Sequence, residues 1–186
     1  MRFKPSILFV MLSSLLLTLS ACVKDGDFGQ ANTVAFSPTL KSDLILSSFG
    51  AATFMDQSTC YEQTVFADTI PMRLMHSDPL VELLAKTSLS FKFENSLDAD
   101  FKIAFKFLDA SNEPKYALEI PVSAGLVDTP IEVESIAIIE GSELQLFKDV
   151  TKLVYKIIPR HSDEHQMFDS NGVLELQLDA TYFFDK

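Results

Sequence analysis

The chain has 186 residues, 47% apolar and 22% charged, a composition that fits one folded domain with a hydrophobic core and excludes an intrinsically disordered chain. Its 26 acidic residues outnumber its 15 basic residues, which gives a formal net charge of −11 at pH 7. A surface this acidic repels phosphate groups, so we expect neither nucleic acid as a partner nor direct electrostatic docking on anionic lipid headgroups.

The first 21 residues have the three parts of a secretory signal peptide. Arg2 and Lys4 form a positive start, the apolar run Ile7–Leu19 follows, and small residues lead to Cys22. A helix of this length is roughly 20 Å long, too short for the roughly 30 Å of hydrocarbon that a membrane span must cross. Residues 1–21 are therefore predicted to be a cleaved signal and not a stable membrane span.

The residues Leu19-Ser20-Ala21-Cys22 resemble the lipobox of bacterial lipoprotein signal peptides. The resemblance implies that the peptide is cut before Cys22, that this thiol carries a lipid and that the new amino group is acylated. Each buried CH₂ contributes about 0.8 kcal/mol, so several acyl chains anchor a protein firmly to a membrane. Plain secretion after an ordinary cleavage, or retention of the uncleaved segment, is the alternative interpretation.

Residues 22–34 are predicted to be the lipidated cysteine and a flexible tether, because small and polar side chains dominate them. Val23 is not acidic, so the inner-membrane retention signal of enteric bacteria is absent. Lys24, Asp25 and Asp27 resemble the short signals that move Bacteroidota lipoproteins to the cell surface, and a solvated tether explains the same residues.

Over residues 35–186 the apolar side chains recur at every second position, which is typical of half-buried β-strands. Turn-forming residues at 95–100, 109–114 and 170–172 separate the stripes. Because alternation leaves one face of each strand polar, a parallel sheet is excluded. We predict a single all-β domain, an antiparallel β-sandwich of immunoglobulin-like or similar Greek-key form, with consecutive strands joined as hairpins. The stripes are Phe91 and Phe93; Phe101, Ile103, Phe105 and Phe107; Tyr116, Leu118, Ile120 and Val122; Ile131 and Val133; and Leu174, Leu176, Leu178, Ala180, Tyr182 and Phe184.

Two short helices are predicted within this domain. Asp78-Pro79 before Leu80–Lys86 supplies an acidic cap and a proline at the first helical position. Ser142 and Gln145 form a capping-box pattern at the start of the second helix. Thr151–Ile158 then has apolar residues on both faces, which predicts a central strand.

Two stretches carry a broader resemblance. FENSLDADFKIAFKFLD (Phe93–Asp109) and VTKLVYKI (Val150–Ile157) look like segments of small lipoproteins from flavobacteria and related Bacteroidota. The resemblance implies an envelope lipoprotein with an antiparallel β domain, and it carries over no catalytic residue.

The residue types that bind metals or act as nucleophiles are few. Cys60 is the only thiol left once Cys22 is lipidated, so we predict a buried, inert side chain, with pairing to a second chain as the alternative. His161 and His165, with Asp163 between them, have the spacing of a helical zinc site, but their proline- and glycine-flanked context favours a hairpin loop and no metal.

Two acidic turns offer the oxygen ligands that calcium prefers, but neither has the glycine and the terminal glutamate of a calcium-loop motif. Local turn chemistry explains them, and no cofactor is expected. These turns contain Glu94, Asp98 and Asp100, and Asp109, Asn112 and Glu113.

The sequence has no Gly-x-Ser-x-Gly, no His-Glu-x-x-His and no glycine-rich phosphate loop. We therefore expect a non-catalytic accessory or interaction module, held by lipid on Cys22 at the outer membrane of a Gram-negative envelope, on its periplasmic face or at the cell surface. An envelope protein is the expected partner. The alternatives are a small envelope hydrolase with its site on the 159–171 loop, and a sandwich that holds a lipid or peptide between its sheets.

Overall fold

The computed structural model describes residues 38–54, 65–72, 78–160 and 171–185. Contacts between residues divide the chain after Phe36, and Ser37–Lys186 form one compact unit. The strands and helices of the described residues all belong to this unit.

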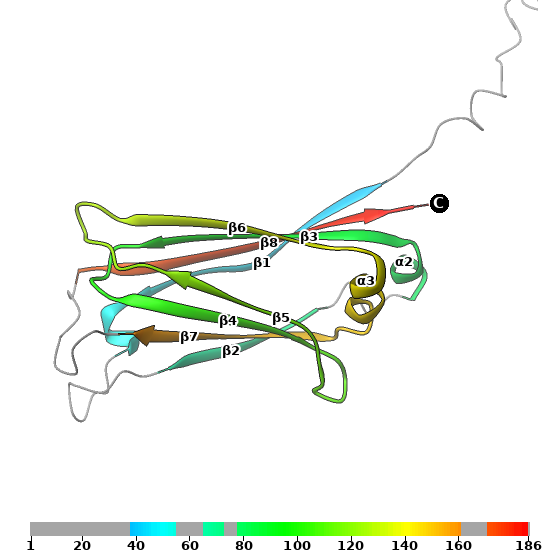
Figure 1. The fold of residues 1–186 in the computed structure, drawn as a ribbon, viewed down its shortest axis with the longest axis horizontal. Helices are drawn as coiled ribbons and strands as arrows, with labels where there is room; N and C mark the ends of the chain where they lie inside the picture. The colour runs from blue at the N-terminus through cyan, green and yellow to red at the C-terminus, as the bar shows by residue number, and fades with distance from the viewer. Residues whose placement is uncertain (1–37, 55–64, 73–77, 161–170, 186) are drawn as a thin grey trace, which may run out of the picture. The chain divides into compact units, whose positions relative to one another are not determined.

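Two antiparallel four-stranded sheets face each other across a hydrophobic core (Figure 1). One sheet has the strand order β1-β8-β3-β6 and the other β2-β7-β4-β5. This order is that of a jelly roll, an eight-stranded sandwich made of two Greek keys. The predicted all-β antiparallel sandwich is confirmed, in its Greek-key form. The strands are β1 (Thr39–Gly50), β2 (Phe66–Pro71), β3 (Leu84–Asn95), β4 (Asp100–Leu108), β5 (Pro114–Val122), β6 (Ile131–Ile139), β7 (Lys152–Arg160) and β8 (Val173–Phe184).

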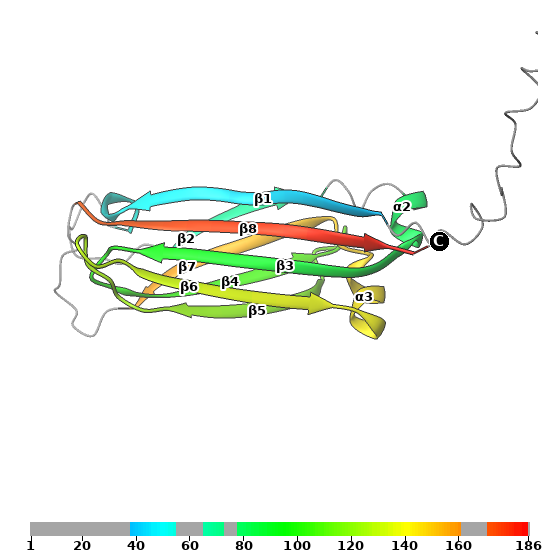
Figure 2. The same cartoon turned by 90° about the horizontal axis from the view of Figure 1, so that it is seen from above.

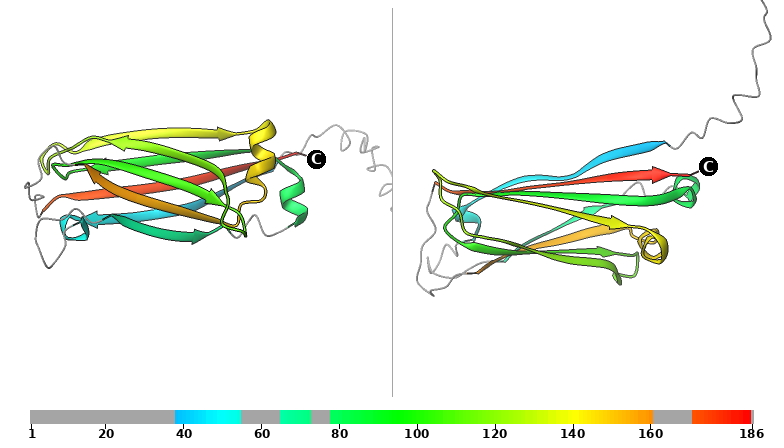
Figure 3. Two further views of the ribbon diagram at one scale, coloured as in Figure 1. Left: turned by 60° about the horizontal axis from the view of Figure 1, so that its bottom comes forward. Right: turned by 45° about the horizontal axis from the view of Figure 1, so that its top comes forward.

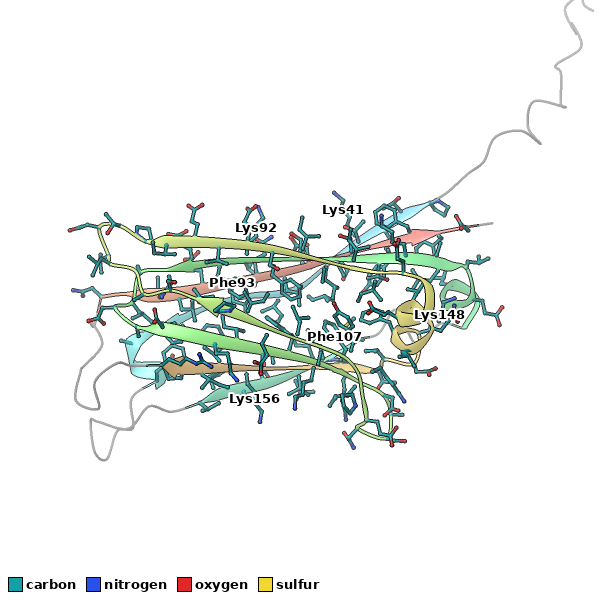
Figure 4. All side chains as sticks on the ribbon, viewed as in Figure 1. Lys41, Lys92, Phe93, Phe107, Lys148 and Lys156 are labelled. Atoms are coloured by element: carbon teal, nitrogen blue, oxygen red, sulfur yellow. The ribbon has the colours of Figure 1, made fainter. Side chains whose placement is uncertain are left out.

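Aromatic rings fill the space between the sheets. Phe91 of β3 meets Phe105 of β4 with ring centroids 4.8 Å apart, and Phe105 also stacks on Tyr155 of β7 at 6.3 Å. Figure 4 shows Phe93 and Phe107 pointing into this space, whereas the labelled lysines of the strands point away from it. The alternation read from the sequence therefore identified which faces of β3 and β4 are buried.

The prediction that consecutive strands form hairpins is right for one pair and wrong for another. β4 and β5 pair as an antiparallel hairpin. β3, however, pairs with β6 and β8, and the chain crosses to the opposite sheet between Asn95 and Asp100. Both Asn95 and Leu97 are fully buried at this crossing. A two-residue period reports which face of a strand is buried, and it holds no information about the strand's neighbours.

The helices are shorter than predicted. α2 (Asp78–Glu82) ends before the predicted limit at Lys86, because Leu84 already belongs to β3 and its side chain packs in the core. α3 (Gly141–Phe147) follows β6, and a 3₁₀ turn, η3 (Ala51–Phe54), follows β1. Among the helices in the described part of the chain, none is long and apolar enough to cross a membrane.

The predicted capping box at Ser142 is wrong. The N-cap residue of α3 is Glu140, its side chain makes no capping hydrogen bond, and Ser142 lies within the first turn. The chain leaves the buried end of β6 at Ile139 and turns through Gly141, whose φ is +59°, so the end of the strand fixes where the helix begins. The predicted central strand is confirmed, since β7 lies between β2 and β4.

One end of the sandwich, called the helical end below, carries α2, α3, the start of β1 and the end of β8 (Figures 2 and 3). Backbone hydrogen bonds tie these parts together. The Phe184 amide donates to the Pro38 carbonyl at 3.1 Å, and the Asp185 amide donates to the Leu83 carbonyl at 2.9 Å. The Lys148 ammonium, just after α3, donates to the carbonyl of Glu82 in α2 at 3.3 Å.

Candidate functional site

A depression of about 500 Å³ lies on the outer side of the β1-β8-β3-β6 sheet. All four strands of that sheet contribute residues to it, so the register in which the strands pair determines which side chains line the depression. Its outward-pointing lining is called the acidic face below. The acidic face comprises Leu46 and Ser48 of β1, Glu175 and Gln177 of β8, Lys92 and Glu94 of β3, and Glu132 and Glu134 of β6.

Strand pairing arranges the acidic face in two rows across the sheet. In the first row Glu175 of β8 pairs with Glu94 of β3, and Glu94 pairs with Glu132 of β6, so three carboxylates stand side by side. Ser48 pairs with Glu175 and completes this row on β1. Like charges directly opposite each other on paired strands are destabilising. The first row therefore works against stability, which is typical of a surface kept for binding.

The second row contains the one cation of the acidic face. Lys92 pairs with Glu134 across the strands, with 2.9 Å between the Lys92 Nζ and the Glu134 Oε1 atoms. The hydrogen bond from this ammonium to Glu134 and the attraction between the two charges raise the pKa of Lys92. Both side chains are more than half exposed, so water screens the pair. Because Lys92 is paired with Glu134, its charge does not offset the first row, and the carboxylates of that row make the acidic face negative.

Asp179 continues the acidic character along β8. Its Oδ2 accepts a hydrogen bond of 2.8 Å from the Gln177 side-chain amide. Its Oδ1 is buried and has no hydrogen-bond partner among the described residues. Gln177, which pairs with Lys92 in the second row, is thereby held in position.

Apolar side chains flank the acidic face on both edge strands. Leu46 of β1 is 82% exposed, and on β6 Ile136 and Ile138 are 68% and 52% exposed. These residues point outward on the strands that end the sheet, where their neighbours on one side are missing. The face thus combines carboxylates at its centre with bulky apolar groups at its edges.

Five of the residues singled out from the sequence as site candidates lie outside the described residues. This holds for the lipidation candidate Cys22, for Cys60 and for the proposed metal candidates His161, Asp163 and His165. Their predicted roles remain predictions.

The two acidic turns are described, and their side chains serve the turns. Asp109 Oδ1 accepts hydrogen bonds from the amides of Ser111 and Glu113 at 2.8 and 2.9 Å, and its Oδ2 lies 3.0 Å from the Lys115 ammonium. These interactions, led by the Glu113 amide, lower the pKa of Asp109. Asn112, in the same turn, has a φ of +68°, which asparagine tolerates better than most residues.

The other turn does not gather its acids either. Asp100 Oδ1 accepts a hydrogen bond of 2.7 Å from the Ala124 amide, whereas Glu94 belongs to the acidic face. Asp98 has its own interaction partner. Within the described ranges, no group of three histidine, cysteine or acidic side chains is placed to hold a metal ion.

Sequence reasoning missed the acidic face. Ser48 and Glu175, which are neighbours on this face, come from opposite ends of the domain sequence and meet only through the pairing of β1 with β8. The available signal was the polar half of each alternating strand, such as Lys92 and Glu94 between buried phenylalanines. That signal identified a solvated face without saying which strands would share it.

No protein-family model matches the sequence, and no curated protein matches it. Three similar solved structures share its strand-rich architecture at low identity. A candidate secreted protein of Parabacteroides distasonis ATCC 8503 is 15% identical, with a TM-score of 0.45, over 64% of this chain and 37% of that one. The infectious bursal disease virus Gx strain structure is 10% identical, with a TM-score of 0.44, over 82% and 33%. Desmodium yellow mottle tymovirus is 14% identical, with a TM-score of 0.36, over 82% and 89%.

The present chain therefore spans about a third of the length of the first two of these structures. Each is a protein to which this jelly-roll domain is similar in fold.

Proposed function

We propose that this protein is a lipid-anchored, non-catalytic interaction module of a Gram-negative bacterial envelope, and that the acidic face binds a partner protein. The observation that carries the proposal is the depression of about 500 Å³, built by all four strands of one sheet. A rigid sheet holds its side chains in fixed register, which suits recognition of a partner of fixed shape.

The charges of the acidic face indicate the chemistry of that partner. Three carboxylates in one row, with Lys92 already paired to Glu134, favour a partner surface rich in lysine or arginine. The exposed Leu46 adds an apolar contact at the edge of the depression. Complementary charge raises the association rate and makes it sensitive to salt, so binding is expected to weaken at high ionic strength.

The anchor completes the proposal. Ser20 and Ala21 before Cys22 support lipidation, and the resemblance to Bacteroidota lipoproteins supports an outer-membrane location, on the periplasmic face or at the cell surface. A lipid-held domain is confined near one membrane, which raises the effective concentration of partners in that membrane.

Two observations favour this function over the other candidates. The described residues include no histidine and no cysteine, so a hydrolase that uses either residue as base or nucleophile would depend on residues outside them. Between the sheets, Phe91, Phe105 and Phe107 are fully buried and in ring contact with neighbours, so core side chains occupy that space. A hollow of about 190 Å³, lined by Leu44, Ile70 and Tyr182, lies where β1 and β8 meet β2, and the outer depression of about 500 Å³ offers a ligand more room.

Site-specific photo-crosslinking in intact cells tests the proposal. A photo-reactive amino acid at Leu46 is expected to form a discrete adduct with an envelope protein. The matched control is Lys106, an exposed residue on the outer side of the other sheet, where no such adduct is expected. Charge reversal by Glu94→Lys and Glu132→Lys is expected to reduce the Leu46 adduct severalfold. The absence of an adduct at Leu46, or equal adducts at both positions, would contradict the proposal.

The anchor is tested separately. Cys22→Ala is expected to move the protein from the membrane fraction to the soluble fraction. A variant that still sediments with membranes and resists extraction by salt would argue against lipidation.

A further inference from the structure

Four leucines are exposed at the helical end of the sandwich. Leu40 on β1, Leu80 on α2, Leu83 just after α2 and Leu146 on α3 are each between 42% and 52% exposed. The inward residues of the same elements, such as Phe147 of α3, are buried in the core. The helical end therefore presents apolar side chains to solvent from three different elements.

Hydrogen bonds at this end connect the elements that carry the leucines. Pro38, two residues before Leu40, accepts from Phe184, and Leu83 accepts from the next residue, Asp185. The ammonium of Lys148, two residues after Leu146, is bonded to α2 through Glu82. The exposed leucines thus lie at the end of the sandwich where β1 begins.

We propose that the helical end docks on the surface of the membrane that holds the lipid anchor, with these leucines inserted at the boundary between the headgroups and the acyl chains. The proposal rests on the proposed lipidation of Cys22. The predicted tether and the residues that follow it, from Cys22 to Ser37, number 16, and a chain of this length without regular structure has an expected end-to-end distance of about 22 Å. The sandwich is about 40 Å long, from the 12 residues of β8. Such a linker keeps the helical end nearer to the membrane than the opposite end.

Apolar exposure alone does not single out the helical end. Leu126, in the connection between β5 and β6 at the opposite end, is 59% exposed (Figure 2). The distinguishing feature is the end of the sandwich at which the chain enters β1. That end carries the four leucines, whereas Leu126 lies at the opposite end. Exposed acids at the helical end, including Glu82, Glu143 and Asp149, favour a zwitterionic lipid surface over an anionic one.

Single-tryptophan fluorescence tests the proposal, because the natural sequence contains no tryptophan. The full-length protein, purified from membranes with its lipid, is reconstituted into vesicles of phosphatidylcholine and phosphatidylethanolamine in which the phosphatidylcholine carries brominated acyl chains. Leu146→Trp is the reporter at the helical end, and Leu80→Trp is a second reporter on α2. Leu126→Trp is the matched control at the opposite end.

Bromine quenches a tryptophan that inserts into the acyl region. The Leu146→Trp and Leu80→Trp emission is expected to fall by about half, as for side chains buried 5–10 Å into the interface, while Leu126→Trp emission stays unchanged. Adding anionic phosphatidylglycerol is expected to reduce the quenching at Leu146→Trp.

Failure of membrane docking and failure of the lipid anchor give different results in this experiment. Vesicle-bound protein in which Leu146→Trp and Leu80→Trp are quenched no more than Leu126→Trp would overturn docking while leaving the anchor intact. This outcome would indicate that a protein partner or a second copy covers the leucines instead. Protein that does not sediment with the vesicles at all would overturn the lipid anchor and, with it, membrane docking.

Discussion

The side-chain amide of Asn95 donates a hydrogen bond of 2.8 Å to the carbonyl oxygen of Ser123, across 28 residues of sequence. The same amide donates to the Ala99 carbonyl at 2.9 Å, and the Asn95 Oδ1 atom accepts from the Leu97 amide at 3.0 Å. Asn95 is fully buried. This one side chain joins the crossing from β3 to β4 to the segment that leads from β5 to β6, so two connections between the sheets share it.

Asn95→Ala is expected to reduce the free energy of unfolding by about 3 kcal/mol, because it leaves buried backbone groups without hydrogen-bond partners. Chemical denaturation of the variant and the natural protein measures the difference. Gln145→Ala, at an exposed position of α3, is the control and should change stability by less than about 0.5 kcal/mol. A loss below 1 kcal/mol for Asn95→Ala would show that the crossing from β3 to β4 tolerates backbone groups without hydrogen-bond partners.

Gly125→Ala is expected to be strongly destabilising for a steric reason. A Cβ atom at Gly125 would lie 1.9 Å from the carbonyl oxygen of Asn95, which is backbone and cannot rotate away. We expect a loss of about 3 kcal/mol, the upper range for overpacking. Gly50→Ala is the matched control, since nothing lies within 4 Å of a Cβ at that position. Equal effects of the two substitutions on the urea midpoint would contradict the close approach of Gly125 to the Asn95 carbonyl.

Phe105 is the central ring of the core. It contacts Phe91 and Phe93 of the opposite sheet and Tyr155 of its own sheet. Phe105→Ala is expected to cost about 4 kcal/mol, and Phe105→Leu about 1.5 kcal/mol, because leucine fills much of the same volume. Leu46→Ala, on the exposed acidic face, should leave the unfolding midpoint almost unchanged. A Phe105→Ala protein as stable as Leu46→Ala would mean that the sheets do not pack through this ring.

The alternation of β8 could be read directly from the sequence, because one face of the strand is buried along its whole length. All six predicted residues from Leu174 to Phe184 lie in the core. The turn at 109–114 could also be predicted, since Asp109, Asn112 and Pro114 are turn formers for local reasons.

Pairings between distant strands could not be predicted in this way. The crossing at Asn95–Asp100 has the composition of a hairpin turn, and only the long-range bond from Asn95 to Ser123 shows that the chain changes sheets there. The acidic face depends on the same long-range register, through the pairing of Ser48 with Glu175. Local sequence patterns therefore indicated the strands from β3 to β8 and the buried faces of those that alternate, and they indicated neither β2, nor the sheet order, nor the depression.

Ionisation of Tyr182 is expected to reduce the stability of the fold in alkaline solution. Burial raises the pKa of this phenol from 10.0 to about 12. The unfolded chain loses the proton first, so this contribution is intact below pH 10 and is lost as the pH rises from 10 to 12. The loss grows by at most about 1.4 kcal/mol per pH unit and reaches about 2 kcal/mol at pH 12, where half of the folded-state phenol is also ionised.

Denaturant titrations from pH 9 to pH 12 measure this effect against Tyr182→Phe, which has no phenolic proton. The difference in unfolding free energy between the natural protein and Tyr182→Phe should shift by about 2 kcal/mol over the range, in favour of the variant at high pH. Parallel curves for the two proteins would show that Tyr182 ionises as easily in the folded state as in the unfolded one.

Intact-mass spectrometry of the mature protein, isolated from membranes of the native host, tests the lipid anchor most directly. The expected product begins at Cys22 and carries a mass increment of a thioether-linked diacylglycerol together with an amide-linked acyl chain. A product that begins at any other residue, or one that begins at Cys22 with an unmodified thiol, would contradict lipid anchoring.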